Sequence, residues 1–233
     1  MTKTLTTVAF DADDTLWHTE RFFRLTQAKF AELLSDFTEL AHLEERLLAA
    51  ERRNVGHYGF GTKGFVLSMI ETAIEVTEER VPASVIAELM TCGREMLQHP
   101  IELLPHAKEV VETLSKTHRL LLITKGDLLD QERKVAQSGL GELFEWVEIV
   151  SHKTSDTYIR AFNSYADGPE RALMVGDSMK SDIVPSLSVG SWAAHVPNGP
   201  AWALEQAEAP KDNPRFVALS SLSEVLPLVE DVG

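Results

Sequence analysis

The chain has 233 residues, enough for one large domain or for a core domain with a smaller inserted one. Its net charge of −14, from 22 basic and 36 acidic residues, argues against binding to nucleic acid or to an anionic membrane surface. Cys92 is the single cysteine, which excludes an intrachain disulfide, and no apolar run approaches the roughly 20 residues that span a bilayer. We therefore expect a cytoplasmic protein with no membrane partner.

An apolar first strand, expected over residues 5–11, ends in a group of carboxylates. Asp11, Asp13 and Asp14 fall within four residues. Like charges this close repel and raise one another's pKa, so the group is costly unless a metal or another cation neutralises it. Ligands bind at the carboxyl ends of strands in open α/β sheets. The stretch therefore predicts the functional end of the first strand.

A helical block follows, with no convincing strand from Glu20 to about Gln98. Glycines at positions 56, 59, 61 and 64 predict a loop over residues 54–64. We expect residues 17–100 to form an inserted all-helical domain that closes over the site and excludes water. Tyr58 and Lys63 of the loop are candidate substrate contacts, because loops often carry function. The alternative is that the loop aromatics pack inside the helical domain.

Strands and helices alternate from Pro105 to the end of the chain. Four consecutive aliphatic residues, 120–123, are typical of a strand buried on both faces. Further strands are expected over residues 146–150, 171–175, 192–196 and 216–219. This alternation predicts an α/β fold with a doubly wound, Rossmann-like parallel sheet and helices on both faces. Residues 1–16 and 101–233 are the expected core domain.

Polar residues follow three more of these strands. Thr124 and Lys125 end the second strand, Lys153 follows the third, and the segment 176–182 with Asp177 and Asp182 follows the fourth. Each feature alone is more often a helix cap, a surface charge or a turn. Their repetition at strand ends of one sheet indicates a ligand site.

Together these motifs resemble those of the haloacid dehalogenase superfamily of hydrolases. The matching motifs are Asp-x-Asp-x-Thr at residues 11–15, an apolar run into Thr124, Lys153, and Gly-Asp-Ser-x-x-x-Asp at residues 176–182. The match covers the whole α/β part, and the inserted helices are similar to the helical cap of that superfamily. The resemblance implies an enzyme, a hydrolase, with a Rossmann-like core.

For the chemistry, the resemblance implies a Mg²⁺-dependent phosphatase that cleaves a small phosphate monoester through an aspartyl-phosphate on Asp11. Asp13 would protonate the leaving oxygen and then activate water. Thr124 and Lys153 would contact the phosphate. The implied Mg²⁺ ligands are Asp11, Asp13 through its backbone carbonyl, and Asp177, with Asp182 in support. The expected partner is a small phosphorylated metabolite; the oligomeric state is not predicted.

Two alternatives and two departures from the motifs stay open. A phosphomutase would use the same core residues, and a metal-independent 2-haloacid dehalogenase would use the same nucleophile on carbon. The dehalogenase branch generally lacks an acid at the position of Asp13, which favours the phosphatase. Asp14 stands where the superfamily commonly has glycine, and aspartate tolerates a left-handed backbone. Lys125 stands where a small polar residue is common, and is either a second phosphate contact or a surface charge.

Overall fold

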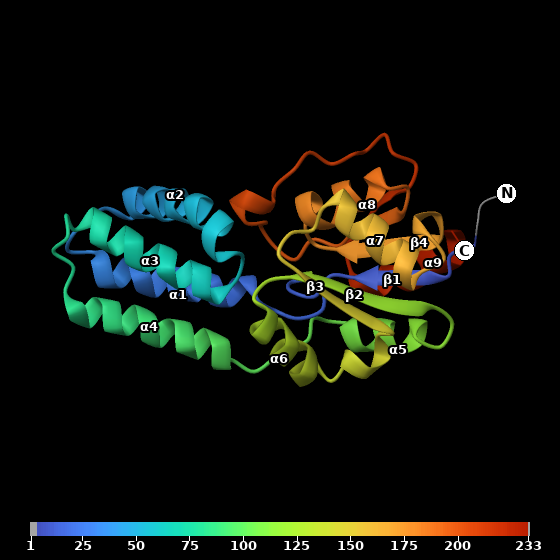
Figure 1. The fold of residues 1–233 in the computed structure, drawn as a ribbon, viewed down its shortest axis with the longest axis horizontal. Coiled ribbons are helices and arrows are strands. Elements are labelled where there is room, and N and C mark those ends of the chain that lie inside the picture. Colours follow the sequence, from blue (N-terminus) through green and yellow to red (C-terminus); the bar gives the residue numbers. More distant parts are fainter. Residues whose placement is uncertain (1–3, 233) are drawn as a thin grey trace. The chain divides into compact units, whose positions relative to one another are not determined.

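The computed structural model describes residues 4–232 and divides the chain into two compact units. Unit one comprises the chain up to His18 and from Ile101 onward, and unit two is Thr19–Pro100. Figure 1 follows the chain from blue through green and yellow to red, with unit two in blue to green. Within the described residues, no helix combines the length and the apolar character needed to cross a membrane.

Unit one is built around a six-stranded sheet in which every pairing is parallel. Its strands are β1 (Thr7–Phe10), β2 (Arg119–Lys125), β3 (Trp146–Val150), β4 (Ala172–Gly176), β5 (Trp192–His195) and β6 (Phe216–Ala218). Their order in the sheet is β3-β2-β1-β4-β5-β6. Phe10, at the end of β1, pairs with Leu122 of β2 and with Val175 of β4. The expected doubly wound α/β fold is therefore confirmed, with the carboxyl ends of β2, β1 and β4 side by side.

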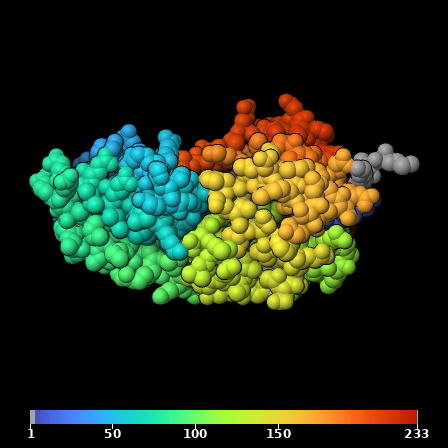
Figure 2. Space-filling view, in the orientation of Figure 1, coloured from blue at the N-terminus to red at the C-terminus, as the bar shows by residue number. Residues whose placement is uncertain are grey.

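Helices cover both faces of this sheet, as the continuous buried runs of β2 and β4 require. The helices are α5 (Ala107–Leu114), α6 (Leu128–Ser138), α7 (Ser155–Tyr165), α8 (Val184–Ser188) and α9 (Val225–Val232). Val8 and Phe10 of β1 pack in one core cluster with residues of α5 and α9, whereas Ala9 packs in another with residues of α7. Figure 2 shows yellow and orange atoms, the colours of the segment that includes α7, on the face of unit one toward the viewer.

Unit two consists of helices packed on a separate apolar core. They are α1 (Glu20–Leu34), α2 (Leu40–Tyr58), α3 (Thr62–Val76) and α4 (Ala83–Gln98). Buried residues of all four helices, among them Phe30, Leu47, Met69 and Leu89, form one cluster. Because these side chains pack together with their partly buried neighbours, the four helices share one core.

The loop predicted over residues 54–64 is much shorter in the structure, so its predicted bounds are wrong. Helix α2 continues to Tyr58 and α3 begins at Thr62, which leaves only residues 59–61 between them. Gly56 and Gly64 lie inside these helices. Glycine in a helix costs about 1 kcal/mol relative to alanine. The buried contacts between α2 and α3, including the hydrogen bond from Asn54 to Ser68, outweigh that cost.

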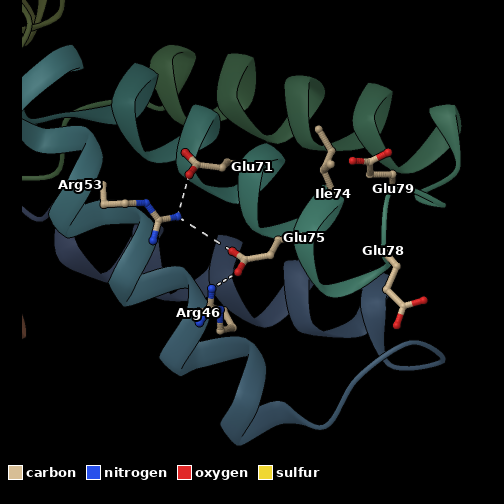
Figure 3. Close-up of a pocket in the computed structure, with 7 residues that line it drawn as sticks. All are labelled: Arg46, Arg53, Glu71, Ile74, Glu75, Glu78 and Glu79. Atoms are coloured by element: carbon tan, nitrogen blue, oxygen red, sulfur yellow. Dashed lines mark hydrogen bonds and ion pairs between the residues drawn. The ribbon is translucent and has the colours of Figure 1, made fainter.

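A charged hollow of about 550 Å³ lies on α2 and α3 of unit two (Figure 3). Arg53 pairs with Glu71 at 2.6 Å, and Arg46 pairs with Glu75. Figure 3 shows these ion pairs linking the two helices along the wall of the hollow. The paired side chains are 35–48% exposed, a range in which an ion pair contributes at most about 1 kcal/mol. We interpret the hollow as an ion-pair network between helices.

Candidate active site

Three carboxylates meet at the carboxyl ends of β1 and β4. Asp11 directly follows β1, and its backbone N–H donates to the carbonyl of Val175 at 2.9 Å, which extends the pairing of the two strands. Asp177 directly follows β4, and Asp182 lies in the helical turn Met179–Ile183. One oxygen of each of the three carboxylates lies within 4.8 Å of the others. The fold therefore assembles the acidic cluster that the sequence motifs predicted.

Gly176 makes room for Asp182 in this cluster. A Cβ atom at position 176 would lie 2.3 Å from Oδ2 of Asp182 and 2.6 Å from its Cβ. Asp182 is fully buried, and its Oδ2 accepts from the backbone N–H of Ser178 at 3.0 Å. A side chain at position 176 would displace this carboxylate. The glycine is thus needed for the geometry of the site.

Lys153 supplies the positive charge at the centre of the cluster. It comes after β3, its side chain is 1% exposed, and its Nζ donates to Asp11 and, at 2.7 Å, to Asp182. Burial disfavours the charged form of Lys153, but the carboxylates of Asp11 and Asp182 outweigh it and raise its pKa above the usual range. Lys153 is therefore a fixed cation beside the predicted nucleophile.

Burial raises the pKa of Asp11, the nearby carboxylates of Asp182 and Asp13 raise it further, and Lys153 opposes them. Asp177 behaves in the same way. Burial raises its pKa well above the ordinary value, and so do the charges of Asp11 and Asp182. One lysine thus only partly neutralises the cluster.

Asp13 lies in the turn after β1, where four hydrogen bonds hold its carboxylate. Its Oδ1 accepts from Nε1 of Trp17 at 2.8 Å and from Nζ of Lys134 at 2.9 Å. Its Oδ2 accepts from Nε2 of Gln131 at 3.0 Å and from Lys134 at 3.1 Å. Burial disfavours the charge of Lys134, but Asp13 and Asp130 outweigh it and raise its pKa. The predicted acid–base residue is thus held on several sides.

Gln131 connects Asp13 to the predicted phosphate contact Thr124. Its Nε2 also donates to Oγ1 of Thr124 at 2.7 Å, and both Gln131 and Thr124 are 1% exposed. Asp127 caps α6 by accepting from the backbone N–H of Asp130 at 3.2 Å, as aspartate does at helix N-termini. The cap begins α6 shortly after β2, so the first turns of this helix lie beside the carboxyl ends of the strands.

The two departures from the superfamily motifs have distinct structural outcomes. Asp14 has a φ of +60°, the left-handed conformation that the sequence analysis expected aspartate to tolerate there. Lys125 forms an ion pair with Glu205, and its Nζ also donates to Oγ of Ser181 at 2.9 Å. Glu205 lies in the short helical turn Ala203–Glu205, between β5 and β6. Lys125 is thus a partner of the partly buried Glu205, whereas its role as a phosphate contact stays a prediction.

The structure brings together the predicted residues of unit one and leaves two others in unit two. Asp11, Lys153 and Asp182 are joined by direct contacts, and Asp13 and Thr124 are joined through Gln131. Tyr58 is the last residue of α2, and Lys63 lies in the first turn of α3. Their part in substrate binding stays a prediction.

A divalent cation fits the charges at this site. When ionised, Asp11, Asp177 and Asp182 bring three negative charges to the cluster, and Lys153 brings one positive charge. The remaining two negative charges match Mg²⁺, which prefers oxygen ligands such as carboxylates. The raised pKa of Asp177 supports the same conclusion, since a carboxylate in this position lacks a sufficient counter-charge.

The sequence analysis missed three residues that contact the site. Gln131 and Lys134 are three residues apart, which places them on the same side of a helix, and that helix directly follows a motif. This spacing was an available signal. Glu205 lies in a long irregular connection between β5 and β6, and such connections often carry function. Nothing in the local sequence around Glu205 indicates that it would reach Ser178, Ser181 and Lys125.

Comparisons with solved structures agree with this architecture. A haloacid dehalogenase-like family hydrolase from Xanthomonas campestris is 39% identical, with 98% of this chain and 92% of that chain covered and a TM-score of 0.88. YfnB from Bacillus subtilis, whose structure is bound to magnesium, is 16% identical over 97% and 99% of the chains, with a TM-score of 0.68. A 2-haloacid dehalogenase from Pseudomonas syringae is 21% identical over 98% and 99% of the chains, with a TM-score of 0.60.

The structures of YfnB and of the Pseudomonas dehalogenase are only 16% and 21% identical to this chain, so they show the fold alone. The search among curated proteins found no match. The family model described as haloacid dehalogenase-like hydrolase matches residues 5–187, which is most of the chain and includes all four motifs. Taken with the 39% identity to the Xanthomonas hydrolase, this match shows that the chain belongs to the haloacid dehalogenase-like hydrolases.

Proposed function

We propose that this hydrolase is a Mg²⁺-dependent phosphatase that cleaves a small phosphate monoester through an aspartyl-phosphate on Asp11. The observation that carries the proposal is an acid, Asp13, two residues after the nucleophile and linked through Gln131 to the expected phosphate contact Thr124. Phosphate-ester hydrolysis needs such a group, because the leaving alkoxide must take up a proton. Cleavage of a carbon–halogen bond releases halide, which needs none.

The chain's own residues account for both halves of the reaction. An oxygen of Asp11 attacks phosphorus, the bond between phosphorus and the ester oxygen breaks, and Asp13 gives its proton to that oxygen. Asp13, now ionised, takes a proton from a water molecule that attacks the phosphoryl group and frees the carboxylate of Asp11. Lys153 and the hydroxyl of Thr124 bind the phosphoryl oxygens and offset their charge. The products are the alcohol and inorganic phosphate.

Asp11, Asp177 and Asp182, with the backbone carbonyl of Asp13, would hold the magnesium ion. When bound there, Mg²⁺ supplies positive charge for the phosphoryl oxygens and for the carboxylates that Lys153 leaves unneutralised. The two surplus negative charges of the cluster support this assignment. They also weigh against a metal-independent dehalogenase, in which these carboxylates would lack a counter-charge.

The test is phosphate release from 4-nitrophenyl phosphate with Mg²⁺ or with a chelator, in the natural enzyme and in Asp11→Asn. We expect turnover that requires the metal and is lost in the variant. Asp156→Asn, an exposed aspartate on α7, is the matched control and should keep its activity. Halide release from 2-chloropropionate without metal would replace the proposal with a dehalogenase. Transfer of the phosphoryl group to a second hydroxyl of the substrate, instead of to water, would indicate a phosphomutase.

A further inference from the structure

Helix α6 presents two side chains to the acid–base residue Asp13. We propose that Lys134 and Gln131 are positioning residues that fix the orientation of the Asp13 carboxylate relative to the phosphate contact Thr124. The inference rests on the proposed phosphatase function, in which Asp13 protonates the leaving oxygen. It extends that function by assigning a task to two residues outside the sequence motifs.

Lys134 holds both oxygens of Asp13. Its Nζ lies 2.9 Å from Oδ1 and 3.1 Å from Oδ2, and its side chain is 13% exposed. A donor that reaches both oxygens fixes the rotation of the carboxylate about its last side-chain bond, which one hydrogen bond would leave free. Nε1 of the buried Trp17, 2.8 Å from Oδ1, holds the same orientation from the turn after β1. Lys134 is thus one side of a clamp and Trp17 the other.

Gln131 links this orientation to the phosphate end of the site. Its single amide nitrogen donates to Oδ2 of Asp13 at 3.0 Å and to Oγ1 of Thr124 at 2.7 Å. Gly126, between β2 and α6, has a φ of +149°, and a Cβ atom there would lie 3.1 Å from Cγ and Cδ of Gln131. The turn therefore needs glycine for the amide to lie between the two residues. One nitrogen thus relates the position of the acid to that of the phosphate contact.

A misplaced acid has a recognisable kinetic effect. Proton transfer to the leaving oxygen matters most when the leaving group is a strong base. Phenyl phosphate and 4-nitrophenyl phosphate differ by one nitro group, but phenolate is much the stronger base. If the Asp13 carboxylate is misplaced, hydrolysis of phenyl phosphate should therefore slow more than hydrolysis of 4-nitrophenyl phosphate. A change that only loosens the fold would slow both alike.

The experiment compares kcat for both substrates in Lys134→Met, Lys134→Arg and Gln131→Met. We expect Lys134→Met to lower kcat for phenyl phosphate at least about tenfold more than kcat for 4-nitrophenyl phosphate, since general acid catalysis contributes typically 10²–10⁴-fold. Lys134→Arg should bring the ratio of the two kcat values back toward that of the natural enzyme, because it keeps two donors on the carboxylate. Lys116→Met, which removes an exposed lysine of the same unit, is the control and should change neither rate. If Lys134→Met does not fold, Gln131→Met carries the same comparison.

The decisive step adds each change to Asp13→Asn. If Lys134 acts through Asp13, removing it from the Asp13→Asn variant should lower kcat little further. Lys134→Met/Asp13→Asn should therefore turn over as slowly as Asp13→Asn alone. Full additivity of the two effects, or equal losses for both substrates in Lys134→Met, would overturn the positioning role and leave the phosphatase assignment intact. Failure of the natural enzyme to hydrolyse either substrate with Mg²⁺ would instead overturn the proposed function, and this inference with it.

Discussion

The hydroxyl of Thr15 accepts a hydrogen bond from the backbone N–H of Asp177 at a distance of 3.0 Å. The same hydroxyl donates to Oδ2 of Asp11 at 3.2 Å. Thr15 thus joins the segment after β1 to the segment after β4, and it orients two of the carboxylates that we assign to the metal. Nε2 of His195, at the end of β5, donates to the carbonyl oxygen of Asp177 at 2.8 Å and holds the second segment from the other side.

We therefore predict that Thr15→Val weakens Mg²⁺ binding. Residues that orient metal ligands typically contribute about 10–100-fold to metal affinity. The Mg²⁺ concentration for half-maximal activity should rise at least about tenfold, and kcat at saturating Mg²⁺ should fall much less. Thr15→Ser keeps the hydroxyl and should match the natural enzyme. Equal metal dependence in both variants would show that this hydroxyl does not orient the ligands.

Asp11→Asn should abolish turnover because the amide cannot act as the nucleophile. Loss of a nucleophile lowers kcat by up to about 10⁶-fold in well-studied hydrolases. Acid-quenched enzyme incubated with ³²P-labelled substrate should carry label in the natural protein and in Asp13→Asn, but not in Asp11→Asn. Label retained in Asp11→Asn would place the covalent intermediate on another residue.

Lys153→Met should reduce stability as well as activity. The change removes the shared partner of Asp11 and Asp182, both buried, and breaking a buried ion pair from one side typically costs about 3–5 kcal/mol. Urea unfolding in the presence of a chelator measures this loss without the metal. Lys153→Arg keeps the charge and should recover part of the stability. A loss below about 1 kcal/mol in Lys153→Met would mean that the carboxylates find other compensation.

Glu205→Gln should destabilise the protein more than the double variant Lys125→Met/Glu205→Leu does. Lys125 and Glu205 are 17% and 13% exposed, so the single change leaves a mostly buried lysine without its counter-charge. Burial by itself raises the pKa of Glu205, but Lys125 and the hydroxyls of Ser178 and Ser181 outweigh it and lower that pKa. Thermal unfolding of Lys125→Met, Glu205→Leu and the double variant gives the coupling between the two residues, and Glu205→Gln is measured beside them.

Lys125→Met also tests whether Lys125 contacts the phosphate of the substrate. A direct phosphate contact would make Lys125→Met less sensitive to inhibition by inorganic phosphate. We expect that inhibition constant to change less than twofold, because the ammonium group already has a carboxylate and a hydroxyl as partners. A change of tenfold or more would instead assign Lys125 to the phosphate.

The sequence predicted which polar residues lie at the ends of the strands, because that information is local. An apolar run that ends in Asp11, or in Thr124, indicates both a buried strand and the polar group at its end. Parallel pairing then brings these ends to one edge of the sheet. The conformation of Asp14 was predictable for the same reason, since it depends on the residue's own backbone preference.

The contacts of Gln131, Lys134 and Glu205 were not predictable in this way. A helix pattern shows which side chains share a face, but the residues on the opposing strand depend on the crossover and the packing of the helix. The loop expected over residues 54–64 failed for a related reason. The number of glycines indicates only the local free-energy cost of forming a helix. Packing between α2 and α3 determines where those helices end.

The chain leaves unit one and returns to it at neighbouring points. The backbone N–H of His18 donates to the carbonyl of Glu102 at 3.0 Å, and Trp17 pairs with Leu103 in an antiparallel bridge. Residues 19–100 thus form an insertion whose two ends are held together by these backbone contacts. Closing a loop of about 80 residues costs roughly 4 kcal/mol, and doubling its length adds only about 0.6 kcal/mol. The length of this insertion can therefore change greatly at little entropic cost, while the sheet and its carboxylates keep their arrangement.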